Sequence, residues 1–487
     1  MGTNRRDFLK GAAWMGAAAA FSGCATSAAK LGGTGTMSGF AVPPIKTLRT
    51  GHIGLGMRGP AAAHRMASIP GTRVTALCDL FADRVAAVQK WFADHGKPAA
   101  KEYVGEEAWK ALCESDDVDL VYITTPWACH APMALYAMEH GKHVAIEVPA
   151  AMTLEECWAL VETAERTGRH CMQLENCCYG EAEMLSLNLV RNGLLGEIQH
   201  AEGAYMHDLR ELSYLDLAHG GYHDYWRLRW NQRHVGNPYP THGLVPVMQA
   251  MNINRGDRFD YLNCIQCDPK CNDLYAAAKY GADSWQARVH PVCGDQSVTT
   301  IRTVMGRTIM IQHTVNSPRP YSRLNLVQGT KGVFSGIDFS VRDYYVTSGN
   351  PVQIAWEKEL GKGCHSFFDY DEVQKIREEY RHPLWKAAGE LAQKIGGHGG
   401  MDFLMDLRLS YCLQNGLPLD QDVYDLATSC SLCELSERSC RDRGNSQDVP
   451  DFTRGGWKTA KPLGIESVDI EKLGLKDVSR DESQLNV

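Results

Sequence analysis

A glycine motif and a downstream acid are the clearest chemical signal in the sequence. Gly54, Gly56 and Gly59 have G-x-G-x-x-G spacing after an apolar segment, and Pro60 follows where a helix would begin. The first glycine permits a tight turn, the second lets the backbone approach a pyrophosphate, and the third lets helix and strand pack closely. Helix N-termini also offer free N–H groups to phosphates. Asp79 ends the next apolar segment, at the spacing of an acid that binds ribose hydroxyls and repels a 2′-phosphate. These residues predict a dinucleotide site that prefers NAD to NADP.

Residues 47–176 alternate between short apolar segments and longer amphipathic ones, as such a site requires. The expected strands are residues 48–53, 73–78, 118–124, 143–147 and 171–175, and the expected helices are residues 60–68, 81–95, 130–140 and 154–166. This order is typical of an α/β Rossmann domain, a doubly wound parallel sheet with helices on both faces.

Two further side chains fall near the expected carboxyl edge of this sheet. Trp127 follows an expected strand through Thr124-Thr125-Pro126, and ligands of open α/β sheets bind at such strand ends. We therefore expect Trp127 beside the ligand, with simple packing as the alternative. Arg84 lies on an expected helix nearby, and we interpret it as a solvated charge rather than a phosphate ligand.

Residues 177–440 show a different pattern, which predicts a second domain. Residues 198–206 alternate apolar and polar side chains, and residues 297–305 and 308–315 flank Gly306 as the two strands of a hairpin. Together with the helices described next, they predict an α+β domain with a mostly antiparallel open sheet.

Two long helices are expected in the same domain. They cover residues 372–395 and 400–414, and Gly416 and Pro418 would end the second. Residues 441–487 are polar and poorly patterned, and we interpret them as a C-terminal tail.

The N-terminus has the features of an export signal. A twin-arginine pair at Arg5-Arg6 precedes a short apolar stretch and Ser22-Gly23-Cys24. We interpret residues 1–24 as a twin-arginine signal with a lipoprotein-type site at Cys24, and residues 25–46 as a flexible tether. This predicts a periplasmic or membrane-anchored lipoprotein that is exported already folded around its dinucleotide. A fortuitous arginine pair on a helix is the alternative.

Composition narrows the range of partners. The formal net charge is −8, and no basic run occurs beyond the N-terminus, so we expect no nucleic-acid partner. No segment reaches the roughly 18 apolar residues of a membrane-spanning helix. A homo-oligomer remains compatible with the sequence.

The 17 cysteines raise the question of whether the chain binds zinc or forms disulfides. The spacings Cys264-x2-Cys267-x3-Cys271 and Cys430-x2-Cys433 lack the paired motif or His-x-x-x-His that zinc sites usually have. We expect mostly structural thiols, leave one or two late disulfides open, and predict no metal site.

At Glu147-Val148-Pro149-Ala150 the chain resembles the superfamily of glucose–fructose oxidoreductase and inositol dehydrogenase. Those enzymes usually have Glu-Lys-Pro here; Val148 instead matches one branch, glycoside hydrolase family 109, the NAD-dependent α-N-acetylgalactosaminidases. The similarity spans most of residues 48–440. It includes the motifs Gly56-Met57-Arg58-Gly59, Leu174-Glu175-Asn176-Cys177-Cys178-Tyr179-Gly180, Ala204-Tyr205-Met206-His207-Asp208-Leu209-Arg210, Tyr239-Pro240-Thr241-His242-Gly243-Leu244, Arg319-Pro320-Tyr321-Ser322 and His398-Gly399-Gly400-Met401-Asp402.

This resemblance implies two sets of site residues. With the glycine motif, the residues that would line NAD are Gly54, Gly56, Met57, Arg58, Gly59, Asp79, Trp127, Ala128, Cys129, His130, Glu147, Val148 and Asn176. The residues that would line a sugar are Glu175, Tyr205, Arg227, Tyr239, Pro240, Thr241, His242 and Tyr321.

The resemblance also implies a mechanism in which NAD is not consumed. An ordinary glycosidase uses two carboxylates, and no such pair stands out in the sequence. The implied route is instead oxidation, elimination, addition and reduction, which needs two proton-transferring groups. We expect His242 and Tyr205 in these roles, their order open, with Tyr179 in reserve; His398 is either a pocket residue or a helix cap.

The implied substrates are terminal α-N-acetylgalactosaminides, such as those of mucin or blood-group-A-like glycans. Two other functions remain open at this point. One is an exported NAD-dependent sugar or polyol oxidoreductase, against which the absent lysine argues. The other is a surface sugar-binding lipoprotein with a vestigial Rossmann domain, against which the intact glycine motif argues.

Overall fold

The computed structural model describes residues 35–336, 352–359 and 361–475. The chain divides into two units, Met1–Gly35 and Thr36–Val487. The expected export signal, with its arginine pair and Cys24, lies outside the described residues. Among the described residues, no helix is both long and apolar enough to cross a bilayer.

The first sheet of the second unit has the expected Rossmann topology. Six parallel strands lie in the order β3-β2-β1-β4-β5-β6. The strands are β1 Leu48–Ile53, β2 Thr72–Asp79, β3 Lys101–Val104, β4 Leu120–Ile123, β5 His143–Ile146 and β6 Cys171–Gln173. The helices between them are α2 Gly59–Ser68, α3 Ala82–Asp94, α4 Ala108–Cys113, α5 Trp127–Glu139 and α6 Leu154–Thr167. The predicted doubly wound sheet is confirmed.

Helices cover both faces of this sheet because its strands are apolar on both sides. Leu120 and Tyr122 of β4 belong to the hydrophobic cluster that includes α2 and α3. Val121 and Ile123, which point the other way, belong to the cluster that includes α4, α5 and α6. Loops at the carboxyl edge are thereby held in fixed positions.

The second sheet has eight strands in the order β13-β12-β11-β7-β10-β9-β8-β14. Its strands are β7 Ile198–Met206, β8 Phe259–Gln266, β9 Ser297–Thr303, β10 Thr308–Thr314, β11 Leu326–Gly329, β12 Gly332–Gly336, β13 Val352–Trp356 and β14 Gln447–Asp448. Among the strands described in this sheet, only β7 and β10 pair in parallel, and β9 and β10 form the predicted hairpin. The mostly antiparallel α+β domain is therefore confirmed.

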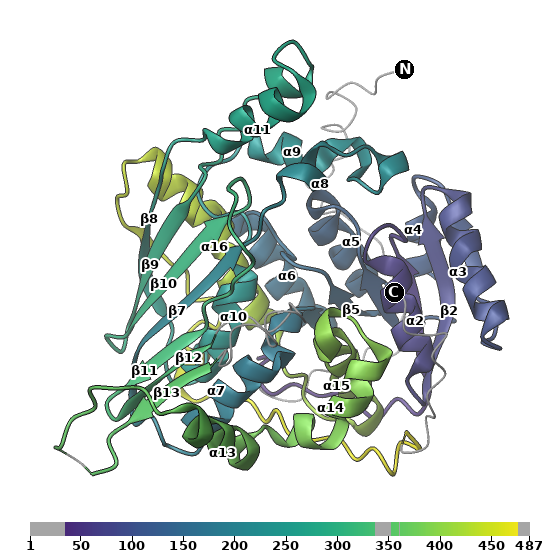
Figure 1. Ribbon diagram of the computed structural model, residues 1–487. Coiled ribbons are helices and arrows are strands. Elements are labelled where there is room, and N and C mark those ends of the chain that lie inside the picture. The colour runs from purple at the N-terminus through teal and green to yellow at the C-terminus, as the bar shows by residue number, and fades with distance from the viewer. Residues whose placement is uncertain (1–34, 337–351, 360, 476–487) are drawn as a thin grey trace. The chain divides into compact units, whose positions relative to one another are not determined.

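Helices pack on the second sheet and connect it to the first. Figure 1 shows β7 to β10 side by side, with α10 (Thr241–Ala250) and α16 (Val423–Arg441) against them. α16 also packs on α6 of the Rossmann half. The other helices are α7 Glu181–Arg191, α8 Arg210–Tyr214, α9 Trp226–Asn231, α11 Cys271–Tyr280, α13 Tyr370–Tyr380, α14 Pro383–Ile395 and α15 Met401–Asn415. Short 3-10 helices are η1 Asn176–Tyr179, η2 Leu217–His219, η3 His223–Tyr225, η4 Gln286–Arg288, η5 His398–Gly400 and η6 Gly456–Lys458.

The structure divides one of the two long expected helices and contains the other. The single helix expected over residues 372–395 is wrong: α13 ends at Tyr380, and Pro383, which has no N–H to donate, begins α14. The helix expected over residues 400–414 is present as α15, and Gly416 ends it in the left-handed conformation, with φ of 65°.

The described part of the expected tether packs against the domain core. Met37 is buried, and its N–H donates to the Tyr424 hydroxyl at 3.1 Å. Phe40 contacts the His170 ring, with centroids 4.8 Å apart. The interpretation of residues 36–46 as a flexible tether is therefore wrong, because two apolar side chains are enough to dock this short segment.

The predicted tail is also partly structured. Val449, Phe452 and Ile465 are buried in the core, and β14 pairs with β8. The described cysteines, including those of both short-spaced clusters, are free thiols.

Docking of the N-terminal segment can be tested by substitution. Met37→Ala should lower the free energy of unfolding by about 2–5 kcal/mol, since it leaves a cavity beneath the segment. Met305, which is 60% exposed, offers a control, and Met305→Ala should change stability by about 0.5 kcal/mol or less. Urea unfolding of the full chain, followed by circular dichroism, measures both. Equal midpoints for the two variants would contradict the docked arrangement.

Candidate functional site

A cavity of about 340 Å³ lies at the carboxyl ends of the parallel strands. Both domains contribute to its wall. The predicted residues that line it are Gly54, Gly56, Met57, Arg58, Asp79, Trp127, His130, Glu147, Val148 and Asn176 from the first half, and Tyr205, Arg227, Tyr239 and His242 from the second. The structure thus brings most of the two predicted sets together at one site.

The glycine loop has the geometry that a dinucleotide needs. A Cβ on Gly59 would lie 1.9 Å from the carbonyl oxygen of Gly54, so helix α2 and strand β1 approach as closely as only glycine allows. Gly54 has φ of +90°. A Cβ on Gly56 would meet only the Arg84 guanidinium, at 3.3 Å, and would project into the cavity. The open backbone at Gly56, next to the N-terminus of α2, fits a pyrophosphate.

Asp79 is held at the end of β2 by backbone donors. Its carboxylate accepts the Leu55 N–H at 2.6 Å and the Phe81 N–H at 3.0 Å. Arg84 lies 3.6 Å from the same carboxylate and lines the cavity. The interpretation of Arg84 as a solvated charge is therefore wrong: the turn of the chain after β2 directs its side chain back over the glycine loop.

Trp127 lies in the cavity wall, but as the first residue of α5 and not as the end of a strand. Its ring meets that of Trp226 edge-on at 4.9 Å. Ala128 and Cys129, the next two predicted residues, are not among those that line the cavity. Both ring nitrogens of His130 lie 2.7 Å from backbone carbonyl oxygens, so this side chain fastens α5 to the neighbouring loops.

Aromatic rings enclose a buried arginine on the sugar side of the cavity. The Arg227 guanidinium carbon lies 5.1 Å from the ring centres of Trp127 and Tyr239 and 5.9 Å from that of Tyr205. One nitrogen donates to Tyr222 at 3.2 Å, while Nη2 has no hydrogen-bond partner among the described residues. A buried donor without a partner is costly, so this group suits the hydroxyl or carbonyl oxygen of a polar ligand.

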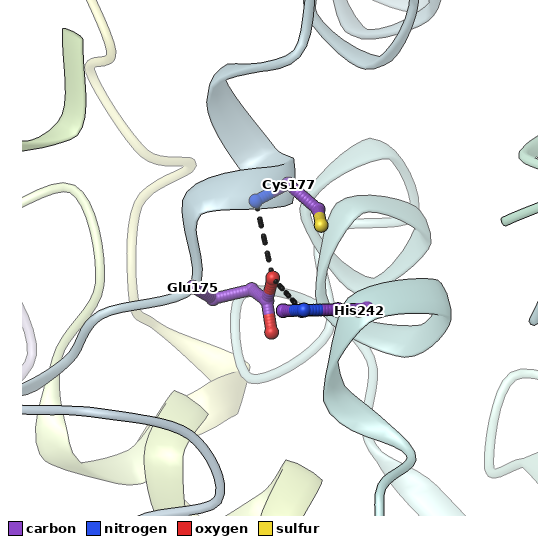
Figure 2. Close-up of side chains that lie close together, drawn as sticks. All are labelled: Glu175, Cys177 and His242. Carbon is purple, nitrogen blue, oxygen red and sulfur yellow. Dashed lines mark hydrogen bonds and ion pairs between the residues drawn. The ribbon is translucent and has the colours of Figure 1, made fainter. Parts of the chain in front are cut away.

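His242 and Glu175 form a hydrogen-bonded pair at the base of the cavity. Figure 2 shows the Glu175 carboxylate between His242 and the backbone of Cys177; it lies 2.6 Å from Nδ1 of the histidine and accepts the Cys177 N–H at 3.1 Å. Burial alone would raise the pKa of Glu175, but His242 and the hydrogen bonds hold it below its ordinary value. An ionised Glu175 fixes the proton on Nδ1, and Nε2 then lies 3.3 Å from the Tyr239 hydroxyl.

The local fold explains this arrangement. His242 is the second residue of α10, which Pro240 caps and Thr241 begins. A Cβ on Gly203 would lie 2.1 Å from the Gly243 carbonyl oxygen, so β7 and α10 are in backbone contact. That contact brings the Tyr205 and His242 rings to 5.2 Å.

His207 is a cavity residue that the sequence analysis did not select. Its Nδ1 lies 3.1 Å from the Tyr205 hydroxyl, and burial lowers the pKa of His207 to about 4, so the ring is neutral at neutral pH. Burial raises the pKa of Tyr205 to about 12. His207 directly follows β7 and lies two residues after Tyr205, a spacing that keeps side chains of an extended chain on one face and could have identified it. The cavity wall also includes His398, Tyr222 and Trp226.

Eight of the predicted site residues lie outside the cavity wall, namely Gly59, Ala128, Cys129, Glu175, Tyr179, Pro240, Thr241 and Tyr321. Tyr179 is fully buried and donates to Asp420 at 3.0 Å, so its role is structural and its selection as a reserve catalytic residue is wrong. Pro240 and Thr241 start α10 behind the wall. Tyr321 packs edge-on against His207, with ring centres 4.9 Å apart.

The structure also assembles one potential metal-ligand group, which the sequence analysis did not identify. Ligand atoms of Glu175, Cys177 and His242 lie within 4.8 Å of one another. Carboxylate, thiol and imidazole are the donor types that Zn²⁺ prefers. In this structure, however, the carboxylate binds the histidine and the peptide N–H directly.

Comparisons with known proteins agree with the geometry. Residues 179–459 match the family model "Glycosyl hydrolase 109, C-terminal domain", and residues 48–174 match "Oxidoreductase family, NAD-binding Rossmann fold". A glycosyl hydrolase family 109 protein of Shewanella amazonensis is 47% identical over 470 residues, which cover 95% of this chain and 99% of that protein. An α-N-acetylgalactosaminidase of Bacteroides fragilis is 46% identical over 420 residues, covering 86% and 95%.

Solved structures show the same fold at low sequence identity. Levoglucosan dehydrogenase in complex with NADH and levoglucosan has a TM-score of 0.60 at 18% identity, over 83% of this chain and all of that one. An oxidoreductase domain protein from Kribbella flavida has a TM-score of 0.61 at 20% identity, with the same coverage.

Substitutions in the glycine loop can separate cofactor binding from folding. Gly56→Ala places a methyl group in the cavity, where only a flexible arginine end must move, so NAD affinity should fall at least about tenfold, the equivalent of ~1.4 kcal/mol, with little change in thermal stability. Bound NAD per purified chain and its dissociation constant provide the measurement. Gly464→Ala, which has open space around its Cβ, is the matched control. Unchanged NAD affinity in Gly56→Ala would place the pyrophosphate elsewhere.

Proposed function

The chain belongs to glycosyl hydrolase family 109 and carries an NAD-binding Rossmann domain, and from this we propose that it hydrolyses terminal α-N-acetylgalactosaminides without net consumption of NAD. One observation carries the proposal. The dinucleotide loop and the group formed by Tyr205, Tyr239 and His242 line the same cavity. A cofactor and a sugar bound there would meet at the side chains suited to proton transfer.

The acids of the cavity support this route over hydrolysis by two carboxylates. Glu147 is paired with Arg58 at 3.2 Å, and Asp79 accepts two backbone N–H groups. Glu175 lies behind His242 and is fully buried. The three described acids that line the cavity, Asp79, Glu106 and Glu147, all come from the Rossmann half, and two of them are already engaged, which does not favour a pair of carboxylates flanking a glycosidic bond.

The glycine loop and Asp79 would hold NAD, which would supply a hydride acceptor for carbon 3 of the sugar and a source of hydride for the final reduction. A ketone at carbon 3 acidifies the proton on carbon 2, whose removal allows the aglycone on carbon 1 to leave. Water then adds at carbon 1, and a proton returns to carbon 2. His242 and Tyr205 carry the two proton transfers, at carbon 2 and at the carbon 3 hydroxyl. Glu175 keeps the His242 proton on Nδ1, so Nε2 is free to accept one.

Arg227 and the tyrosines orient the sugar. The Nη2 group of Arg227 has no partner among the described residues, so it binds a hydroxyl or the N-acetyl oxygen and stabilises charge that develops on the neighbouring oxygen. The Tyr205 hydroxyl is hydrogen-bonded to Nδ1 of the neutral His207, and this contact orients the tyrosine oxygen in the cavity.

The same proposal extends to location and substrate. The twin-arginine pattern and Cys24 support export and membrane anchoring, and a cofactor that is regenerated in each cycle suits a compartment without an NAD supply. Exposed glycans of the mucin or blood-group-A type present the required terminal sugar.

The mechanism can be tested with p-nitrophenyl α-N-acetylgalactosaminide in deuterium oxide and no added NAD. Nitrophenol should be released, and the sugar product should carry deuterium at carbon 2, because that proton exchanges during elimination and addition. Mass spectrometry of the product checks the exchange. Hydrolysis without deuterium at carbon 2 contradicts the mechanism. NADH accumulation without nitrophenol release would instead identify a dehydrogenase.

The Glu175–His242 pair gives a second test. His242→Ala should reduce kcat by about 10²–10⁴, and Glu175→Gln should reduce it less, with KM little changed, because the imidazole remains but its orienting charge is lost. His200→Gln, a substitution of a partly exposed histidine on β7, should retain native kcat. Steady-state kinetics of the three variants provide the check. Native kcat in His242→Ala would refute the assignment.

A further inference from the structure

We propose that Asp402, on α15, is a positioning residue for the cofactor: it fixes Arg58 and Asn176 in the cavity wall and thereby determines how firmly NAD is retained. The inference deepens the proposed function, because a redox-neutral cycle requires that NAD stay bound between turnovers. It depends on the cofactor site alone and not on the identity of the sugar.

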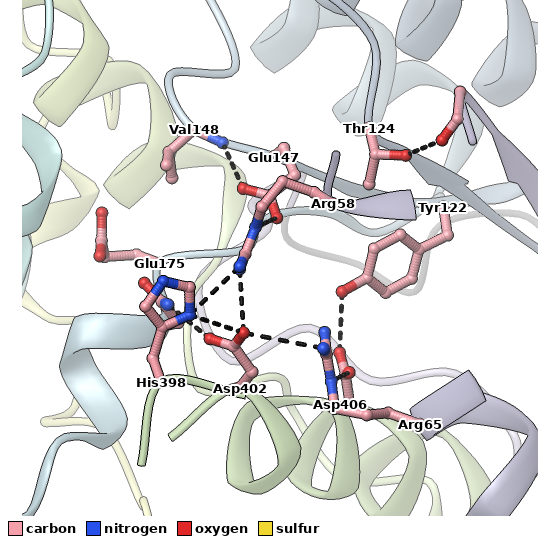
Figure 3. Close-up of polar contacts among 12 residues, drawn as sticks. Arg58, Arg65, Tyr122, Thr124, Glu147, Val148, Glu175, His398, Asp402 and Asp406 are labelled. Carbon is pink, nitrogen blue, oxygen red and sulfur yellow. Dashed lines mark hydrogen bonds and ion pairs between the residues drawn. The ribbon is translucent and has the colours of Figure 1, made fainter. Parts of the chain in front are cut away.

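Asp402 binds three side chains of the cavity wall at once. It accepts hydrogen bonds from Arg58 Nη2 at 3.0 Å, from Asn176 Nδ2 at 2.5 Å and from His398 Nδ1 at 2.9 Å. Arg58, Asn176 and His398 all line the cavity, whereas Asp402 is fully buried behind them. Figure 3 shows Asp402 below Arg58 and beside His398. One carboxylate therefore connects the glycine loop, the end of β6 and the start of α15.

Arg58 is held between two carboxylates. Its Nε binds Glu147 at 3.2 Å, and its Nη2 binds Asp402, so the plane of the guanidinium is fixed. About a third of the Arg58 side chain is exposed, and it projects into the cavity from the loop between Gly56 and Gly59. A fixed, partly exposed cation in this loop is suited to the anionic backbone of a dinucleotide.

The charge on Asp402 is stabilised by its surroundings. Burial alone would raise the pKa of its carboxyl, but Arg58, His398 and Arg65 hold that pKa well below its ordinary value. Asp402 also lies in the first turn of α15, where the free N–H groups of a helix favour an acid. The carboxylate is thus ionised, as its two arginine neighbours require.

A glycine turn brings this helix end to the cofactor loop. Gly397 has φ of +84°, and a Cβ there would lie 2.6 Å from the Asp402 side chain. Gly400, with φ of +103°, immediately precedes α15. The glycines in residues 397–400 therefore allow the start of α15 to pack close to the glycine loop. Residues of the C-terminal half thereby contribute to the cofactor site of the Rossmann half.

Asp406 provides a matched comparison one turn further along α15. It is also fully buried, and it binds Arg65 at 2.7 Å and the Tyr122 hydroxyl at 2.9 Å. Neither Arg65 nor Tyr122 lines the cavity. Arg65 also lies 3.7 Å from Asp402, so loss of charge at Asp406 perturbs the same helix and reaches the cofactor wall only indirectly, through Arg65.

The test compares Asp402→Asn with Asp406→Asn in the NAD-loaded enzyme. NAD retained per chain after gel filtration, and its rate of loss on dilution, are measured without sugar, together with the thermal midpoint. Asp402→Asn should lose NAD at least about tenfold faster than the native enzyme, whereas Asp406→Asn should lose stability but retain NAD. Native retention in Asp402→Asn, or equal NAD loss in both variants, overturns the proposal.

A double substitution tests whether Asp402 acts through its cavity partners. In an Arg58→Ala background, Asp402→Asn should accelerate NAD loss much less than it does in the native chain, because the group it positions is gone. Fully additive effects would contradict the proposed role. If Asp402→Asn does not fold, Asn176→Ala removes one of its contacts and should still accelerate NAD loss; native retention there would also overturn the proposal. Because no glycosidase assay is involved, failure of the proposed reaction would leave these results unaffected.

Discussion

The hydrogen bond between Glu175 and His242 is the contact on which the site depends. It joins a residue that follows the last strand of the Rossmann sheet to the second residue of a helix that packs on the other sheet. A buried carboxylate is stable only when it is paired, so the two halves must meet in one register for this pair to form. The same register brings Tyr205 and Tyr239 beside the histidine and places all three near the glycine loop.

Close backbone approaches make that register possible. Gly59 allows α2 to touch the strand turn, and the facing pair of Gly203 and Gly243 allows β7 and α10 to touch. A Cβ at any of these positions would lie 1.9–2.1 Å from a backbone atom of the facing segment, so the elements would have to move apart. Gly397 and Gly400 likewise permit close packing at the start of α15, which brings Asp402 within hydrogen-bond distance of Arg58. The parts of the cavity at the glycine loop and at His242 are therefore held by elements in backbone contact.

Local patterns were reliable where the residues act through the chain next to them. The glycine motif, Asp79 and the strand alternation predicted the doubly wound Rossmann sheet, although not the short β3 and α4. Val148 indicated the branch of the superfamily. Local patterns failed where a contact from far along the chain decided the outcome. Arg84 turns back over the glycine loop, Tyr179 donates to Asp420, and Met37 docks on Tyr424. Pro383 is a local signal of a helix end, but the helical periodicity of the residues on both sides led to the prediction of one continuous helix.

The sequence by itself determined the two-sheet architecture and the dinucleotide loop, because periodicity and glycine spacing act over a few residues and need no partner. Most of the other residues around the cavity were selected only through the family resemblance. Only the tertiary structure decided which of these side chains do the chemistry and which support it. It pairs His242 with Glu175, brings His207 to Tyr205, and places Asp402 behind Arg58 although 344 positions separate the two in sequence. Such pairings depend on distances across the folded core, and no pattern within either segment specifies them.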